Sequence, residues 1–92
     1  MIKSFRHKGL QRFFESGSKA GIQAVHAPKL RVQLTALNQA SCPSDMAVPA
    51  WRLHSLQGNL KEYWAITVRE NWRIIFTFKG KDVVLVDYRD YH

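Results

Sequence analysis

The chain has 92 residues, a length typical of one folded domain and too short for several. Fourteen Lys and Arg residues against seven Asp and Glu residues leave a net charge of +7, which favours polyanionic partners such as nucleic acid or an acidic protein. Because the single cysteine cannot form an internal disulfide and no apolar run approaches the roughly 20 residues of a membrane helix, we expect one soluble, intracellular domain over residues 1–92.

The start of the chain is predicted to be a short extended segment, residues 1–5, followed by an amphipathic helix over residues 7–16. Three apolar side chains at i, i+3 and i+4, with polar residues between them, indicate this helix: Leu10, Phe13 and Phe14. Gly17 is expected to end it, because glycine adopts the left-handed backbone conformation without strain. One face of this helix should therefore pack on the core.

A second helix is predicted after a glycine- and alanine-rich loop at residues 17–27. Pro28 suits its first turn, where a backbone N–H has no helical partner to lose. Leucines at i, i+4 and i+7 form its apolar stripe: Leu30, Leu34 and Leu37. The helix must end by Pro43, and residues 41–50 are expected to cross to the next layer.

The second half of the chain changes to the alternating pattern of β-strands. We expect a strand over residues 51–56, a hairpin from 64 to 78 and a last strand over 83–88. The last strand is almost continuously apolar, which is typical of a central strand covered on both faces. The sequence therefore predicts an α+β fold, in which two N-terminal helices pack on one face of a four- to five-stranded, mainly antiparallel sheet.

The turn of the hairpin is constrained by the faces of its two strands. A two-residue turn would pair Val68 with Arg73 and mix apolar with polar side chains. A three-residue loop, 69–71, pairs Ile66 with Ile74 instead. It also puts Asn71 in the left-handed conformation, which asparagine tolerates, and we therefore prefer it.

Several polar side chains lie where packing does not require them. His54 and Arg73 each lie opposite the apolar side of their strand, and the chain ends in a cluster of acids, tyrosines, an arginine and a histidine at residues 87–92. Each has an ordinary explanation, as solvent-exposed surface residues or as a cap on the last strand. If the second face of the sheet is left uncovered, these groups converge there as two imidazoles and a guanidinium.

Two imidazoles and a guanidinium are the groups that a metal-free ribonuclease needs. A general base removes the proton of the 2′-OH, a general acid protonates the leaving 5′-oxygen, and a cation stabilises the phosphorane. Histidine titrates near neutral pH, and arginine binds two phosphate oxygens at once. No glycine-rich phosphate loop, HExxH or GxSxG sequence is present, so NTPase, zinc-protease and serine-hydrolase functions lack support, and we expect no metal or cofactor.

Four blocks of the sequence carry a family resemblance. They are MIKSFRHKGL at 1–10, WRLHSLQG at 51–58, YWAITVRENWRIIF at 63–76 and DYRDYH at 87–92. In this order they resemble the HigB toxins of the RelE-type superfamily, from bacterial type II toxin–antitoxin modules. The resemblance implies a microbial RNase fold that enters the A site of the bacterial 70S ribosome in the cytoplasm and cuts mRNA there. It also implies a HigA-type helix-turn-helix antitoxin, with the toxin monomeric when free and part of a higher-order complex when neutralised.

The same resemblance assigns roles to the terminal cluster and to the two strand residues. By motif match, His54 and His92 would be the proton-transfer residues and Arg73 the cation. Asp90 and Tyr91 would orient the chain end and the substrate. These five residues are the predicted catalytic set.

Two further residues are expected to contact RNA. Asn71 would, by the resemblance, touch the A-site codon. Gln57 departs from the family pattern, which usually has lysine there; the amide still donates hydrogen bonds but lacks the charge. Either Arg73 alone supplies the cation, or this toxin is weaker or prefers different codons.

The residues alone leave three classes of function open. The first is an mRNA endonuclease, the second a basic RNA- or ribosome-binding module that blocks translation without cleavage, and the third a protein-interaction domain for an acidic partner. Residues 1–46 hold seven cations and two acids, for +5, whereas residues 47–92 hold seven and five, for +2. This asymmetry indicates that the helical half attracts ribosomal RNA.

Overall fold

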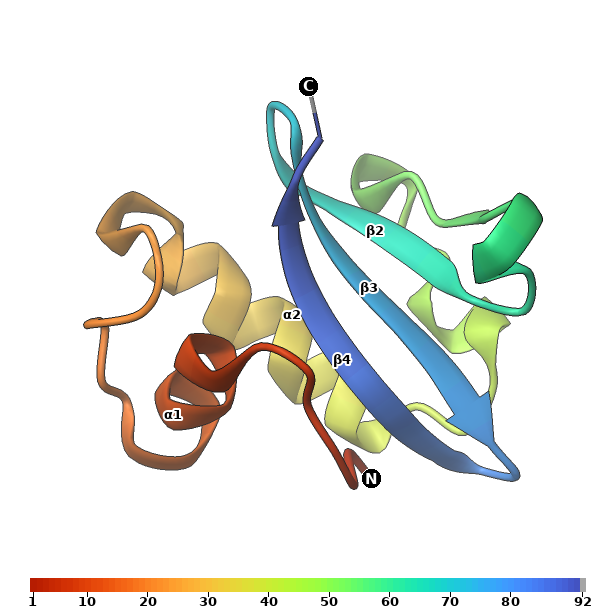
Figure 1. The fold of residues 1–92 in the computed structure, drawn as a ribbon, viewed down its shortest axis with the longest axis horizontal. Helices are drawn as coiled ribbons and strands as arrows, with labels where there is room; N and C mark the ends of the chain where they lie inside the picture. Colours follow the sequence, from red (N-terminus) through yellow and green to blue (C-terminus); the bar gives the residue numbers. More distant parts are fainter. Residues whose placement is uncertain (92) are drawn as a thin grey trace.

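The computed structural model describes residues 1–91 as two helices beside a four-stranded sheet (Figure 1). The helices are α1, Lys8–Ser16, and α2, Ala27–Gln39. The strands, in both chain and spatial order, are β1, His54–Ser55; β2, Trp64–Arg69; β3, Trp72–Lys79; and β4, Asp82–Asp90. All three strand pairs are antiparallel, which confirms the predicted α+β class.

Both helices begin and end close to where the sequence pattern places them. The backbone N–H of Leu10 donates to Nδ1 of His7 over 2.9 Å, which caps α1, and Gly17 ends it at φ 81°. Helix α2 has Pro28 in its first turn and follows a single 3₁₀ turn at Ala24–His26. No helix within residues 1–91 is long and apolar enough to span a membrane.

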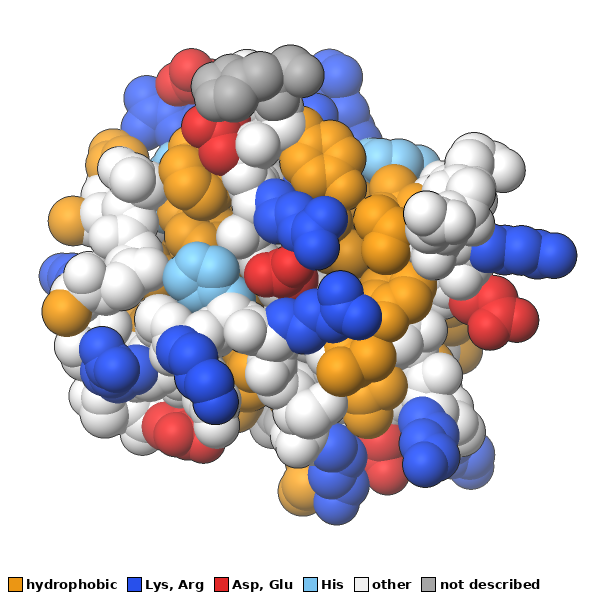
Figure 2. Space-filling view, viewed as in Figure 1, with side chains coloured by type: hydrophobic (Ala, Val, Ile, Leu, Met, Phe, Trp, Pro, Cys, Tyr) orange, Lys and Arg blue, Asp and Glu red, His pale blue; other side chains and the backbone are white. Residues whose placement is uncertain are grey.

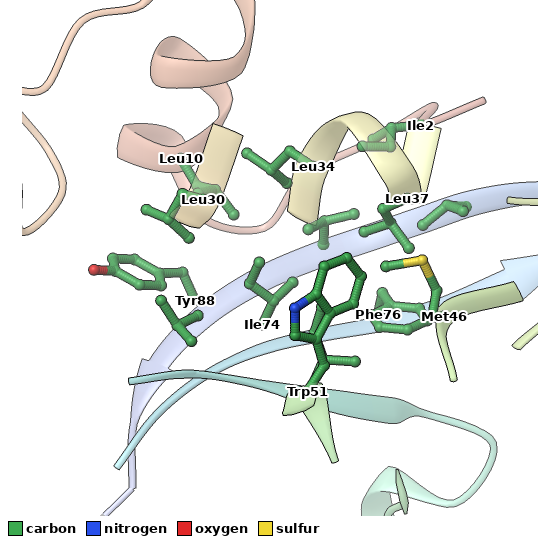
Figure 3. Packing of buried hydrophobic residues seen from close by; sticks show 14 of the residues in the cluster. Ile2, Leu10, Leu30, Leu34, Leu37, Met46, Trp51, Ile74, Phe76 and Tyr88 are labelled. Atoms are coloured by element: carbon green, nitrogen blue, oxygen red, sulfur yellow. The ribbon is translucent and has the colours of Figure 1, made fainter. Parts of the chain in front are cut away.

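The core lies between the helices and one face of the sheet. Figure 3 shows Leu30, Leu34 and Leu37 of α2 above Ile74 and Phe76 of β3, and all five are almost completely buried. Two side chains of the segment between α2 and β1 join the same cluster: Met46 and Trp51. This packing covers a single face, and the other face receives neither helix.

Strand β4 is the last strand of the sheet, so the prediction of a central strand was wrong. Its outer edge is partly covered by the start of the chain, where Ile2 and Phe5 form parallel bridges with Val83 and Val86. The apolar character of β4 reflects this cover on its edge together with the helices on one face. Residues 1–7 therefore lie along the sheet and not apart from it.

The hairpin has the predicted register but a different turn. Ile66 pairs with Ile74, as predicted. Strand β2 nevertheless continues to Arg69, which pairs with Trp72, so the turn has two residues. A register shift between Thr67 and Arg69 absorbs the additional residue. This β-bulge keeps apolar side chains facing the helices without a three-residue loop.

Two other local predictions failed at residues with unusual backbone angles. Glu70, at φ 53°, takes the left-handed position that Asn71 was expected to hold. The strand expected within 51–56 is reduced to His54–Ser55, because Pro49–Trp51 forms a 3₁₀ turn and Arg52 has φ 52°. Strand β1 is consequently short, and its position depends on its pairing with β2.

Candidate active site

The sheet face turned away from the helices carries the predicted chemistry. Side chains alternate along a strand, so the neighbours of the core residues point to this second face. We call it the open face and define it by six strand residues: Ala65, Thr67, Arg73, Ile75, Asp87 and Arg89. Figure 2 shows basic side chains on both sides of an acidic one near the middle of this face. Ala65 and Ile75 are buried, and they form an apolar floor beneath the longer polar side chains.

The register of the sheet brings His54 and Arg73 to this face. His54 and Asp87 are the ends of one row across the four strands, and Arg73 and Arg89 are neighbours in the next row. Adjacent strands lie about 4.8 Å apart and residues two apart along a strand about 6.8 Å, which places the two Cα atoms of His54 and Arg73 about 12 Å from each other. The two side chains therefore share one face of the sheet, in adjacent rows.

A backbone contact fixes the tautomer of the exposed His54 ring. Its Nδ1 lies 2.8 Å from the carbonyl oxygen of Arg52. A carbonyl oxygen only accepts hydrogen bonds, so Nδ1 carries the proton. In the neutral ring Nε2 then has the free lone pair, as a general base requires.

Turn carbonyls hold the guanidinium of Arg73 in place. Its Nη1 donates to the carbonyl oxygen of Glu70 over 2.6 Å and to that of Trp72 over 3.2 Å. Both bonds use one nitrogen, which leaves Nη2 available for a phosphate oxygen. The turn therefore positions a cation beside the row that contains His54.

A second cation on the open face was absent from the predicted site. Nε of Arg89 donates to Oδ2 of Asp87 over 2.7 Å, and this hydrogen bond raises the pKa of Arg89, with a smaller contribution from Tyr91. The backbone N–H of Tyr88 donates to the other carboxylate oxygen over 2.9 Å. The sequence signal for this pair was present, because residues two apart on a strand share a face.

Arg6 and Tyr63 form a further contact that sequence reasoning missed. Nη2 of Arg6 donates to the hydroxyl oxygen of Tyr63 over 3.3 Å, and the guanidinium lies 5.6 Å from the centre of the ring. Arg6 follows the segment that bridges to β4, whereas Tyr63 precedes β2. The contact therefore adds a cation and an aromatic ring beside the row that contains His54.

The chain end is tied to the hairpin turn. The backbone N–H of Tyr91 donates to the carbonyl oxygen of Asn71 over 2.8 Å, and Tyr91 is 38% exposed. Tyr91 also contributes, after Asp87, to the raised pKa of Arg89. Tyr91 thus accompanies Arg73 and Arg89, while His92, the other predicted proton-transfer residue, lies outside the described residues.

The other predicted residues are placed away from these groups. Asp90 pairs with Trp72. Burial is the main cause that lowers the pKa of His26 and raises that of Tyr88; the charge of Asp90 partly opposes the first shift and adds to the second, so Asp90 acts on residues that pack on the helix side of the sheet. Gln57 is exposed on the loop that follows β1. Asn71 is exposed in the turn itself. Only His54, Arg73 and Tyr91 of the predicted set are gathered at the open face among residues 1–91.

A buried aromatic cluster supports the end of the hairpin from the helix side. Nδ1 of His26 lies 2.5 Å from the hydroxyl oxygen of Tyr88, and the Tyr88 and Trp72 ring centres are 4.5 Å apart. Burial is the main cause that lowers the pKa of His26 and raises that of Tyr88. Trp72 and Tyr88 immediately precede Arg73 and Arg89, so this cluster fixes the strands that carry both cations.

The described residues offer acid–base and cationic groups for chemistry. Within residues 1–91, no three His, Cys, Asp or Glu side chains are grouped so that they could hold a metal ion. An imidazole with a free Nε2, two guanidinium groups and a phenol face solvent together. This set suits recognition and cleavage of a phosphodiester.

Comparisons with known proteins give the family. A family model described as the RelE-like toxin of type II toxin–antitoxin system HigB matches residues 3–92. Endoribonuclease HigB of Proteus vulgaris is 41% identical over 92 residues, which are 100% of both chains. Toxin HigB-1 of Vibrio cholerae is 31% identical over 98 residues, covering 100% of this chain and 98% of the relative.

A solved structure supports the fold. It is a copper-bound mutant toxin from Helicobacter pylori, with a TM-score of 0.56 at 18% identity, covering 98% of this chain and 94% of the other. At that identity the likeness concerns the fold alone. The family match over nearly the whole sequence and the identity to two HigB toxins go further: this chain belongs to the HigB family of RelE-like toxins from type II toxin–antitoxin systems.

Proposed function

We propose that this toxin is a ribosome-dependent endoribonuclease that cuts mRNA in the A site and thereby inhibits translation and growth. The observation that carries the proposal is the sheet register, which puts His54 and Arg73 in adjacent rows of one uncovered, basic face. The Proteus vulgaris relative is named an endoribonuclease, which supports the reaction class. The excess of positive charge supports an RNA-rich target.

The proposed reaction needs no external nucleophile. Nε2 of His54 accepts the proton of the 2′-OH, and the 2′-oxygen attacks the adjacent phosphorus. The bond from phosphorus to the 5′-oxygen breaks, and that oxygen takes a proton from His92, to which this proposal gives the role of general acid. Arg73 stabilises the charge on the phosphorane oxygens, with Arg89 and Tyr91 beside it. The products are a 2′,3′-cyclic phosphate and a 5′-OH end.

Two partners follow from this proposal. The toxin acts in the bacterial cytoplasm on the 70S ribosome, where the mRNA codon is presented. Membership of a type II toxin–antitoxin family implies an antitoxin partner. The proposal specifies this antitoxin as a HigA-type helix-turn-helix protein that neutralises the toxin. Asn71 and Gln57, both exposed, would contact the codon or the flanking RNA.

A cleavage assay on programmed ribosomes tests the proposal. Purified toxin is added to 70S ribosomes holding a defined mRNA with a filled P site, and the new RNA ends are mapped. We expect one cut within the A-site codon, cyclic phosphate and 5′-OH ends, and no cut in the same RNA without ribosomes. Intact mRNA on ribosomes that nevertheless stop translating would contradict cleavage and favour a toxin that only blocks the ribosome.

A further inference from the structure

A groove separate from the open face lies between α2 and the end of β2. Its volume is about 460 Å³, and seven residues line it: Val25, His26, Pro28, Lys29, Val32, Val68 and Arg69. Val68 belongs to the core cluster, which places the groove on the helix side of the sheet. The proposed cleavage chemistry uses none of these residues.

The groove exposes apolar surface that folding has not covered. Val25 and Val32 are 64% and 60% exposed, and they are two of only five large hydrophobic side chains exposed within residues 1–91. Pro28 is also exposed, between them in the sequence. Apolar side chains gathered at one hollow are typical of a surface that binds another protein.

The charged groups of the groove are all of one sign. Lys29 and Arg69 are exposed, and no acidic residue lines the groove. Arg69 has only a loose, exposed ion pair with Glu70, at 3.7 Å. A complementary partner therefore combines apolar side chains with carboxylates.

The walls of the groove are held together before any partner arrives. Nε2 of Gln33, a completely buried residue of α2, donates to the carbonyl oxygen of Thr67 in β2 over 2.8 Å. Thr67 directly precedes Val68 at the groove. A clamp between the two walls reduces the ordering that binding requires, which favours affinity.

We propose that this groove binds an acidic segment of the antitoxin, with apolar side chains on Val25 and Val32 and carboxylates beside Lys29 and Arg69. The proposal rests on the antitoxin partner of the proposed function, but it is independent of how the toxin acts on RNA. Antitoxin and RNA would accordingly use two different surfaces of the toxin.

Paired substitutions in the groove test whether this surface binds the antitoxin and is not needed for toxicity. Val25→Glu together with Val32→Glu puts two carboxylates where we expect an acidic partner, and Val48→Glu is the control, since Val48 is also exposed but lies outside the groove. Affinity for the purified cognate antitoxin is measured by titration calorimetry in an Arg73→Ala background, which limits toxicity during expression. Growth after induction is measured in the background that retains Arg73, with and without the antitoxin.

We expect the groove variant to lose at least tenfold in antitoxin affinity and to inhibit growth even when the antitoxin is present. In the absence of the antitoxin, the toxicity of the groove variant should match that of Val48→Glu, and the two variants should have the same melting temperature. Val48→Glu should bind the antitoxin like the unmodified toxin. Unchanged affinity, within twofold, would overturn the proposal. Loss of toxicity in a folded variant would also overturn it, because the groove would then serve the ribosome. A failure to cut mRNA leaves the affinity comparison standing, so the two proposals fail separately.

Discussion

His54 and Arg73 lie on the same open face, and a backbone carbonyl oxygen accepts a hydrogen bond from each of the two side chains. The contact with Arg52 selects one tautomer of His54, and the turn that precedes β3 anchors Nη1 of Arg73. A carbonyl contact leaves each group free to act on a substrate, whereas a salt bridge would occupy it. Arg89 shows the contrast, because Asp87 already neutralises part of its charge. Arg73 is therefore the better phosphate ligand of the two cations.

Replacing Arg73 tests this assignment. We expect Arg73→Ala to lower the rate of mRNA cleavage on programmed ribosomes by about 10²–10³, the usual effect of removing one group that stabilises transition-state charge. Arg73→Lys should recover only part of the rate, because lysine supplies the charge without the planar fork. Single-turnover cleavage at saturating toxin measures both effects.

Arg31→Ala is the matched control for this series. Arg31 is an exposed arginine of α2 whose guanidinium stacks on Phe13, 5.6 Å from the ring centre, away from the open face. Its cleavage rate should equal that of the unmodified toxin. If Arg73→Ala cut mRNA within threefold of that rate, Arg73 would not be the transition-state cation.

At the scale of elements, the spacing of apolar residues was sufficient to predict which side chains of the helices and strands are buried together in the core. The leucine stripe of α2 and the pairing of Ile66 with Ile74 follow from side chains that must share one core, and both are confirmed. Alternation also placed His54 and Arg73 on the opposite face. These features depend on periodicity alone.

The features that the sequence did not predict have two causes: local adjustments of the backbone and contacts between distant parts of the chain. The bulge in β2 and the left-handed Glu70 are local backbone solutions that leave no trace in apolar spacing. Arg6 meets Tyr63 only because the start of the chain pairs with β4, which no local pattern reveals. The edge position of β4 was missed for the same reason.

The aromatic cluster behind the hairpin makes stability depend on pH. Burial, followed by the charge of Arg69, lowers the pKa of His26 below 6.5, although Glu70 and Asp90 oppose this shift. Below pH 6.5 the unfolded chain therefore binds a proton at this position more readily than the folded protein does. The free energy of unfolding should fall as the pH decreases from 7 to 5.

His26→Gln isolates this contribution, because an amide can still bond to the hydroxyl of Tyr88 but does not titrate. We expect the melting temperature of the variant to fall less between pH 7 and pH 5 than that of the unmodified toxin. Melting followed by circular dichroism at both values measures the difference. Equal losses in the two proteins would mean that His26 does not carry the pH dependence.

For the whole molecule, the placement of charge matters more than its total. Residues 3–12 contain four cations and no acid, and their Arg6 reaches the contact with Tyr63 beside the open face. Lys8 and Arg12 of α1, in the same stretch of sequence, are both exposed. The turn between β3 and β4 also has two exposed cations, Lys79 and Lys81, but lies six residues along β3 from Arg73, about 20 Å away.

Two double variants, each of which removes two positive charges, test whether ribosome binding depends on where the charges lie or only on the net charge. Lys8→Gln with Arg12→Gln should weaken binding to 70S ribosomes and reduce the dependence of affinity on salt. Affinity falls as salt rises, and each lost phosphate contact makes the negative slope of log K against log salt less steep by about 0.7–0.9. Lys79→Gln with Lys81→Gln should change the affinity for ribosomes and its salt dependence much less. Binding of fluorescent Arg73→Ala toxin to ribosomes, measured between low and physiological salt, gives both quantities. Equal effects of the two pairs would show that only the net charge of +7 guides the toxin to the ribosome, whatever its position on the surface.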